Sequence, residues 1–185
     1  ILVESIDIET TTEHGMTVQE MLKNPVEEII LITMMNSITK KIVTFGIGGW
    51  DTRKPTDIYV ECKNESHLLR EFLNFWQLNY PNIITGWNIK LFDIPYLVKR
   101  LDIVLGDKYS KKLSPWNSIW EKPAQVKDTE MSSYVINGIS IIDYLDAYKK
   151  FTYVTQESYK LDHIAFVELG ENKLENPGKN FKDFY

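Results

Sequence analysis

The sequence has few of the residues that stabilise a protein by cross-links or metal clusters. Cys62 is its single cysteine among 185 residues, so an internal disulfide framework and a cysteine zinc cluster are both excluded. Its three histidines are widely spaced along the chain, which argues against a histidine zinc site. No apolar run is long enough to span a membrane, and no signal peptide opens the chain. These absences predict a globular protein of a reducing compartment, without a membrane segment.

Positive charge is also scarce. The chain carries 21 basic and 26 acidic residues and a formal net charge of −5, which argues against a protein held on nucleic acid mainly by a basic surface. An enzyme that takes a single strand into a metal-loaded carboxylate cleft stays possible, because the ions supply positive charge. A hydrophobic content of 43% and the chain length suit one domain with a sizeable core.

The opening stretch, residues 1–9, is predicted to form a strand. Because side chains alternate along a strand, Asp7 and Glu9 point to one side, and Ile6 and Ile8 point to the other side, into a core. Two carboxylates on one face of a buried strand repel each other, and a divalent cation relieves that repulsion. Hard oxygen ligands select Mg²⁺ or Mn²⁺. The alternative is an edge strand with two solvated acids, and an isolated D-x-E pattern does not exclude it.

A second acid follows another predicted strand. Residues 83–87 form an apolar strand that runs into a polar turn, and a helix begins near Asp93, with Pro95 in its first turn. Asp93 therefore lies above a strand end, where α/β sheets place their ligand sites. The alternative is that Asp93 only caps the helix.

The other strands and the helix predicted in the first half of the chain follow an order typical of α/β proteins. Strands are expected over residues 28–36, 41–47 and 57–62, with antiparallel pairing of the first two, and a helix capped by Ser66 runs to about Asn79. This order predicts a mixed sheet with helices packed against its faces. The glycines at 46, 48 and 49 indicate a strand end rather than a phosphate loop, because no Lys-Ser/Thr follows them.

The second half is less regular. Asn137-Gly138 predicts a two-residue turn joining residues 134–143 into a β-hairpin. Helices are expected from Asp143 to Phe151 and from Gln156 to Leu169, and residues 170–182 form a polar loop. The hydrophobic residues in the segment 107–132 follow neither a helical nor a strand period. The tryptophans of this segment either stack on bases or fill a small satellite core, and we favour the satellite core.

Two motifs together resemble a known family. Asp7-Ile8-Glu9 and Asn88-x-x-x-Phe92-Asp93-Ile94-Pro95-Tyr96 resemble the first two exonuclease motifs of family B DNA polymerases, especially those of bacteriophages and related viruses. The resemblance extends through Ile142-Asp143 and Ser158-Tyr159-Lys160-Leu161. It implies an α/β, ribonuclease H-like fold, in which a mixed sheet is flanked by helices and accompanied by a β-hairpin. It also implies 3′→5′ proofreading exonuclease activity.

The same resemblance implies a site and partners. Asp7, Glu9 and Asp93 match metal ligands, and Thr10, Asn88 and Phe92 match supporting or substrate-contacting positions. Two divalent ions, Mg²⁺ or Mn²⁺, would clamp the scissile phosphate, with Asp7 bridging them, Glu9 on the water side and Asp93 on the other ion. The substrate is the 3′ end of single-stranded DNA, and the partner is the remainder of the polymerase chain. We expect a monomer in the cytoplasm, that of the host if the chain is viral.

The third motif of the family, Tyr-x-x-x-Asp, is not found. Tyr159 and Asp162 have the wrong spacing and lie too early, so Asp162 is not favoured as a substitute ligand. We expect residues 1–185 to be a single exonuclease-like domain, a fragment of a longer polymerase that ends before this motif. The fourth ligand then lies beyond Tyr185, and the fragment binds metal weakly and cleaves slowly or not at all.

Two other functions stay open. One is a free-standing exonuclease of the wider DEDD superfamily, acting on DNA or RNA, and polymerase palm motifs downstream would argue against it. The other is a nonenzymatic nucleic-acid-binding module, which would bind single strands but no divalent ion. A purely structural domain has no physical need for three acids in register, which favours the polymerase exonuclease.

Overall fold

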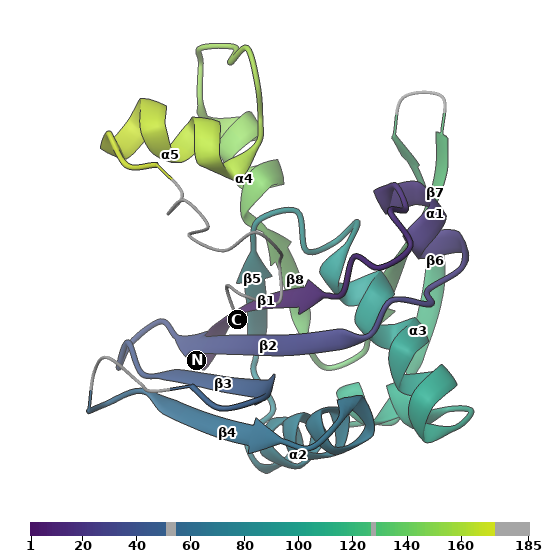
Figure 1. Cartoon of the computed structure of the whole chain (residues 1–185). Helices are drawn as coiled ribbons and strands as arrows, with labels where there is room; N and C mark the ends of the chain where they lie inside the picture. The colour runs from purple at the N-terminus through teal and green to yellow at the C-terminus, as the bar shows by residue number, and fades with distance from the viewer. Residues whose placement is uncertain (51–54, 127–128, 173–185) are drawn as a thin grey trace.

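A six-stranded mixed sheet forms the centre of the molecule (Figure 1). The computed structural model describes residues 1–50, 55–126 and 129–172. The sheet has the order β4-β3-β2-β1-β5-β8. Its strands are β1 (Val3–Thr10), β2 (Ile29–Asn36), β3 (Ile42–Ile47), β4 (Ile58–Cys62), β5 (Ile83–Gly86) and β8 (Ser140–Asp143). A second sheet pairs β6 (Ile119–Val126) with β7 (Thr129–Ile136).

The helices are mostly short. They are α1 (Val18–Lys23), α2 (Glu65–Leu78), α3 (Asp93–Leu105), the 3₁₀ helix η1 (Tyr109–Leu113), α4 (Tyr144–Phe151) and α5 (Leu161–Leu169). In the part of the chain that is described, no helix is both long and apolar enough to cross a membrane. The arrangement confirms the predicted α/β class, with a mixed sheet, flanking helices and an antiparallel hairpin, which is formed by β6 and β7.

β1 is an inner strand with neighbours of opposite direction. It pairs antiparallel with β2 and parallel with β5, and β5 pairs parallel with β8. The carboxyl ends of β1, β5 and β8 therefore point the same way. The predicted alternation in β1 is confirmed, because Ile6 and Ile8 are buried in the core whereas Asp7 is exposed. The predicted antiparallel pairing of β2 with β3 is also confirmed.

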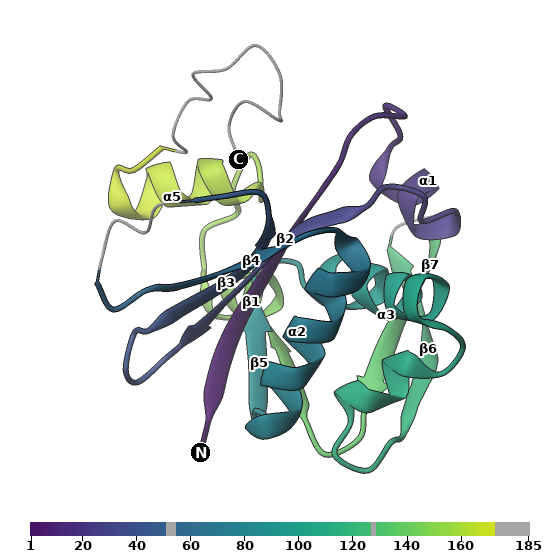
Figure 2. The ribbon, with the colours of Figure 1, turned by 60° about the horizontal axis from the view of Figure 1, so that its bottom comes forward.

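The core lies on the side of the sheet covered by α2 and α3 (Figure 2). The apolar stripe of α2, including Phe72 and Trp76, is fully buried there. The predicted cap at Ser66 is wrong. Asn64 is the N-cap, and its side-chain oxygen accepts from the backbone N–H of His67 at 2.9 Å, so the helix begins at Glu65, one residue before Ser66.

Buried polar contacts fix α3 against its neighbours. The Arg100 guanidinium donates to the Glu65 carboxylate of α2 and to the Pro25 carbonyl oxygen at 2.7 Å. Glu65 also accepts from the backbone N–H of Ile29 at 2.8 Å. The Tyr96 hydroxyl of α3 donates to the Glu27 carbonyl oxygen at 2.7 Å. These bonds hold α3 in its position against the sheet and α2, and the first residue of α3 is Asp93.

The predicted hairpin over residues 134–143 is wrong. Asn137-Gly138 does form a turn, and Gly138 has φ +93°. However, β7 before the turn pairs with β6, whereas β8 after it pairs with β5 in the main sheet. A side chain at Gly138 would meet Pro115 at 2.5 Å. The turn thus packs against the segment before β6 and passes the chain from one sheet to the other.

The satellite core predicted for residues 107–132 is also wrong. This segment forms η1, β6 and the start of β7, and Leu113 belongs to the main core. The Trp76 indole N–H donates to the Leu113 carbonyl oxygen at 2.8 Å, which ties η1 to α2. Trp116 and Trp120 are 71% and 50% exposed, so these tryptophans do not fill a core.

The last described helix begins later in the sequence than predicted. α5 begins at Leu161 instead of Gln156. The Tyr159 carbonyl oxygen accepts from the Trp87 indole N–H at 3.2 Å, so it is bound across the fold before the helix starts. The predicted helix from Asp143 to Phe151 is confirmed as α4, with Asp143 as its N-cap. Most of the predicted loop over residues 170–182 lies outside the described residues.

Candidate active site

Asp93 lies directly against β1. It is the first residue of α3, and 5% of its surface is exposed. Its Oδ1 accepts from the backbone N–H of Ile8 at 3.2 Å, across 85 positions of sequence. The N-cap of α3 is Phe92, whose side chain makes no capping bond. The carboxylate of Asp93 therefore joins the helix start to the middle of β1, which is more than the helix-capping alternative requires.

The surroundings of Asp93 disfavour its charge. Burial raises the pKa of this carboxyl most, and the negative charges of Asp7 and Asp143 raise it further. The hydrogen bond from Ile8 opposes them, and the resulting pKa is about 7 against an ordinary 3.8. A carboxyl in this state gains from a nearby positive charge, which a divalent cation would supply.

The predicted ligands are only partly brought together. Asp7 and Asp93 interact electrostatically, and Glu9 follows two residues later on the same strand. Asp7 is exposed and Glu9 is partly exposed. Residues 1–50, 55–126 and 129–172 contain no compact group of three or more acidic, histidine or cysteine side chains able to hold a metal ion. The described geometry thus supports an Asp7–Asp93 pair, with Glu9 beside it.

The turn before α3 has a defined conformation. Asn88 has φ +62°, and its carbonyl oxygen accepts from the backbone N–H groups of Leu91 and Phe92, each at 3.2 Å. The Phe92 ring stacks on Tyr96 with centroids 5.6 Å apart. Asn88 and Phe92 therefore shape the turn that presents Asp93. Thr10 is buried at the end of β1, after a register shift between Glu9 and Thr10.

Asp143 is an important residue that the sequence reasoning did not select. It is 5% exposed and accepts from the backbone N–H of Asn88 at 3.0 Å, of Lys90 at 3.0 Å and of Leu145 at 2.9 Å. One carboxylate thus caps α4 and holds the turn that leads to Asp93. The available signal was an aspartate between a predicted strand and a predicted helix, the position of an N-cap.

The close packing of β5 on β1 depends on a glycine. A Cβ at Gly86 would lie 2.6 Å from the Ile6 carbonyl oxygen and 2.4 Å from a methyl carbon of Ile89. Gly86 pairs with Asp143 in β8, and its neighbour Thr85 pairs with Ser5 in β1. The absence of a side chain at this position lets β1, β5 and the turn at Asn88 approach one another.

Asp162 is in the last described helix, which follows all of these elements in the sequence. It is in the first turn of α5 and is exposed. Nothing in the described geometry associates it with Asp93, whose electrostatic partners are Asp7 and Asp143.

Comparison with known proteins assigns this arrangement to a family. The sequence profile of the DNA polymerase family B exonuclease domain matches residues 1–164. The chain belongs to this family. Its metal-dependent exonuclease chemistry suits the all-oxygen donor set of Asp7, Glu9 and Asp93 and the raised pKa of Asp93.

Several polymerases are similar to the chain. The DNA-directed DNA polymerase of Escherichia phage RB69 is 33% identical over 202 residues, covering 96% of this chain and 22% of that protein. That of Enterobacteria phage T4 is 39% identical over 121 residues, covering 65% and 14%. The DNA polymerase delta catalytic subunit of Caenorhabditis elegans is 27% identical over 181 residues, covering 91% and 16%. The chain therefore spans less than a quarter of the length of these relatives.

Proposed function

We propose that this chain is the 3′→5′ proofreading exonuclease of a family B DNA polymerase and removes nucleotides from the 3′ end of single-stranded DNA. The observation that carries the proposal is the Asp7–Asp93 pair, held at the junction of β1 and α3 in a chain of the exonuclease family. The homologous polymerases from phages RB69 and T4 support DNA as the substrate.

The carboxylates hold the catalytic metal in this proposal. Asp7, Glu9 and Asp93 would bind two divalent ions, Mg²⁺ or Mn²⁺, through oxygen ligands. When bound, such ions lower the pKa of water and stabilise charge on the attacking and leaving oxygens of a phosphodiester. The chain itself keeps Asp93 in place through the Ile8 backbone N–H and keeps the Asn88 turn in place through Asp143.

The supporting residues orient the strand that is cut. Asn88, Phe92 and Thr10 lie on the turn and strand end that flank the acids. The chain favours a mismatched terminus because such a terminus costs less to unpair and reaches the site more often.

The rest of the polymerase completes this site. A fourth acidic ligand would come from sequence beyond Tyr185, and the remainder of the polymerase chain would be the covalent partner that delivers the 3′ end. The protein would act as a monomer in the cytoplasm, that of the host if its source is a virus.

The experiment is Mn²⁺-dependent digestion of a 5′-labelled single-stranded DNA. The chain, an Asp7→Ala/Glu9→Ala variant and a C-terminally extended form are compared, and products are resolved by length. Successive shortening from the 3′ end by the extended form, together with its loss in an extended form carrying the double substitution, supports the proposal. Turnover by the 185-residue chain equal to that of the extended form would overturn the requirement for a downstream ligand. No metal-dependent shortening by any form would overturn the exonuclease function.

A further inference from the structure

A lysine-lined hollow lies beside α3, outside the acid pair. Its volume is about 440 Å³, and it lies among α3, η1 and the two strands of the second sheet. Its lining includes the lysines at positions 23, 99, 108 and 111, and the aromatic residues Trp120 and Tyr134. Only two carboxylates, Asp102 and Glu121, line the same hollow.

The charge of this hollow is opposite to that of the chain. The whole sequence has a formal net charge of −5, yet the hollow has four lysines against two acids. One acid and one lysine are engaged within the fold, because Asp102 accepts from the backbone N–H of Ser110 at 2.8 Å and from its hydroxyl at 2.9 Å, and the Lys99 amine donates to the Leu22 carbonyl oxygen. Lys108 and Lys111 are exposed. The hollow therefore favours an anionic ligand.

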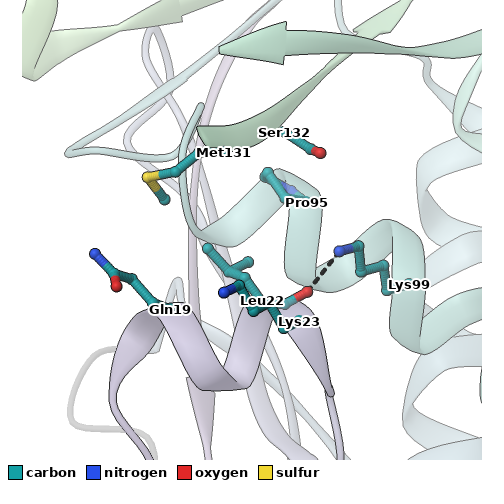
Figure 3. A pocket seen from close by; sticks show the side chains of 7 residues that line it. All are labelled: Gln19, Leu22, Lys23, Pro95, Lys99, Met131 and Ser132. Atoms are coloured by element: carbon teal, nitrogen blue, oxygen red, sulfur yellow. Dashed lines mark hydrogen bonds between the residues drawn. The ribbon is translucent and has the colours of Figure 1, made fainter. Parts of the chain in front are cut away.

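A smaller hollow of about 80 Å³ lies next to this one, among α1, α3 and β7. The two share Lys23 and Lys99, and the smaller one also reaches Pro95, two residues after Asp93 in α3 (Figure 3). The Lys99 amine donates to the Leu22 carbonyl oxygen, which fixes α1 against α3. The shared lysines make one track along α3, from its first turn to η1.

An exposed tryptophan identifies the kind of anion. Trp120, the second residue of β6, is 50% exposed. It lines the larger hollow together with Lys108 and Lys111. Proteins that bind single strands without sequence preference combine lysine contacts to phosphates with aromatic rings on which bases stack. A free phosphate or an acidic peptide would use the lysines but would have no base to stack on Trp120.

We propose that this track, the α3 groove, is a second, noncatalytic binding site for the backbone and bases of single-stranded DNA. The choice of DNA over RNA rests on the proposed function. Lys108 and Lys111 contact phosphates at the far end, and Trp120 stacks on a base. The track ends near Pro95, on another face of α3 than Asp93, because residues two positions apart on a helix do not share a face.

The test is binding of a 5′-fluorescein oligothymidylate to the full chain by anisotropy, in EDTA without divalent ions. Catalysis is then absent, so a failed exonuclease activity does not affect the result. The variants are Lys108→Gln/Lys111→Gln and Trp120→Ala, both at exposed side chains. The matched control is Lys40→Gln/Lys41→Gln, the same charge change at two exposed lysines between β2 and β3, outside both hollows.

The Lys108/Lys111 variant should lower the slope of log K against log salt by about 1.4, because each phosphate contact of a single strand contributes about 0.7. Trp120→Ala should weaken binding about fivefold or more, and the Lys40/Lys41 control should leave both quantities unchanged. No binding by the unmodified chain, or equal losses in the control, would overturn the proposal. Equal competition by polyglutamate and by unlabelled oligothymidylate would assign the groove to acidic polypeptides instead.

Discussion

The backbone N–H of Ile8 donates to Oδ1 of Asp93 at 3.2 Å, so the middle of β1 and the first residue of α3 are held together. This bond places Asp93 beside Asp7, on the neighbouring position of the strand. The contact brings the first and second sequence motifs into one site, although 85 positions separate the bonded residues. It also keeps a buried carboxyl where burial and like charges raise its pKa to about 7.

Asp93→Asn should stabilise the metal-free protein at neutral and alkaline pH. The amide oxygen can still accept from Ile8, but the buried charge is removed. Because the folded-state pKa of Asp93 is raised from 3.8 to about 7, its favourable contribution is present below pH 4 and is lost as pH rises through 7. We therefore expect the variant to gain roughly 1 to 3 kcal/mol at pH 8 and little at pH 4.

Urea unfolding in EDTA at both pH values measures this difference. Asp107→Asn, at an exposed aspartate after α3, is the control and should change stability little at either pH. A loss of stability at pH 8 for Asp93→Asn would show that the ionised carboxylate stabilises the fold.

Substitutions of Asp143 should lower the stability of the protein in proportion to the number of hydrogen bonds that its carboxylate loses. Its Oδ1 accepts from Asn88 and Leu145, and its Oδ2 accepts from Lys90. Asp143→Asn can keep the first two bonds and loses the third, for about 1 kcal/mol. Asp143→Ala loses all three and should cost roughly 3 kcal/mol or more.

The same two variants test whether Asp143 positions the Asn88 turn. Amide hydrogen exchange of the Asn88 and Lys90 N–H groups should quicken in the order Asp, Asn, Ala, beyond the change at distant β3. Uniform quickening across the sheet would mean that Asp143 contributes only to global stability.

Gly86→Ala should disrupt the approach of β5 to β1. The added methyl would lie 2.6 Å from the Ile6 carbonyl oxygen, so the strands must move apart, and we expect a loss of about 1 to 3 kcal/mol. Gly49→Ala is the control, because the nearest atom to its added Cβ is a Glu61 oxygen at 4.0 Å. Thermal unfolding compares the two. Equal effects would show that the clash at Ile6 is relieved without cost.

The sequence predicts individual helices and strands better than it predicts which strands pair and which side chains are buried. The alternation in β1 and the helix start at Asp93 follow from local patterns, and both are confirmed. The hairpin at Asn137-Gly138 is wrong because a local turn signal does not say which sheet receives the following strand. Apolar and aromatic composition likewise does not reveal that Trp116 and Trp120 lie exposed.

The candidate site was predictable to a similar extent. Asp7 and Asp93 were selected by strand alternation and by position above a strand end, and the structure brings them into interaction. Asp143 was missed because its three backbone partners come from two separate segments of the chain. Such convergence is a property of the tertiary structure, and no spacing in the sequence encodes it.

The acid stability of the protein should depend on Glu27. Burial alone would raise the pKa of this carboxyl, but the Thr11 hydroxyl and the backbone N–H groups of His14 and Glu13 donate to it and hold its pKa at about 2. These bonds fix the loop between β1 and α1. A lowered folded-state pKa gives stability that is present above the ordinary value of 4.5 and is lost as pH falls toward 2.

Glu27→Gln should therefore destabilise the protein by about 2 kcal/mol at pH 7 and flatten the fall in stability between pH 4.5 and 2, the range set by the two pKa values. Urea unfolding at pH 7, 4.5 and 3 measures both effects. Glu28→Gln, at the adjacent exposed residue, is the control and should keep the pH profile of the unmodified chain. If Glu27→Gln loses stability in parallel with the unmodified chain as pH falls, other carboxyls control the acid transition. If its profile is flat, the loop between β1 and α1 depends on the ionised Glu27 side chain.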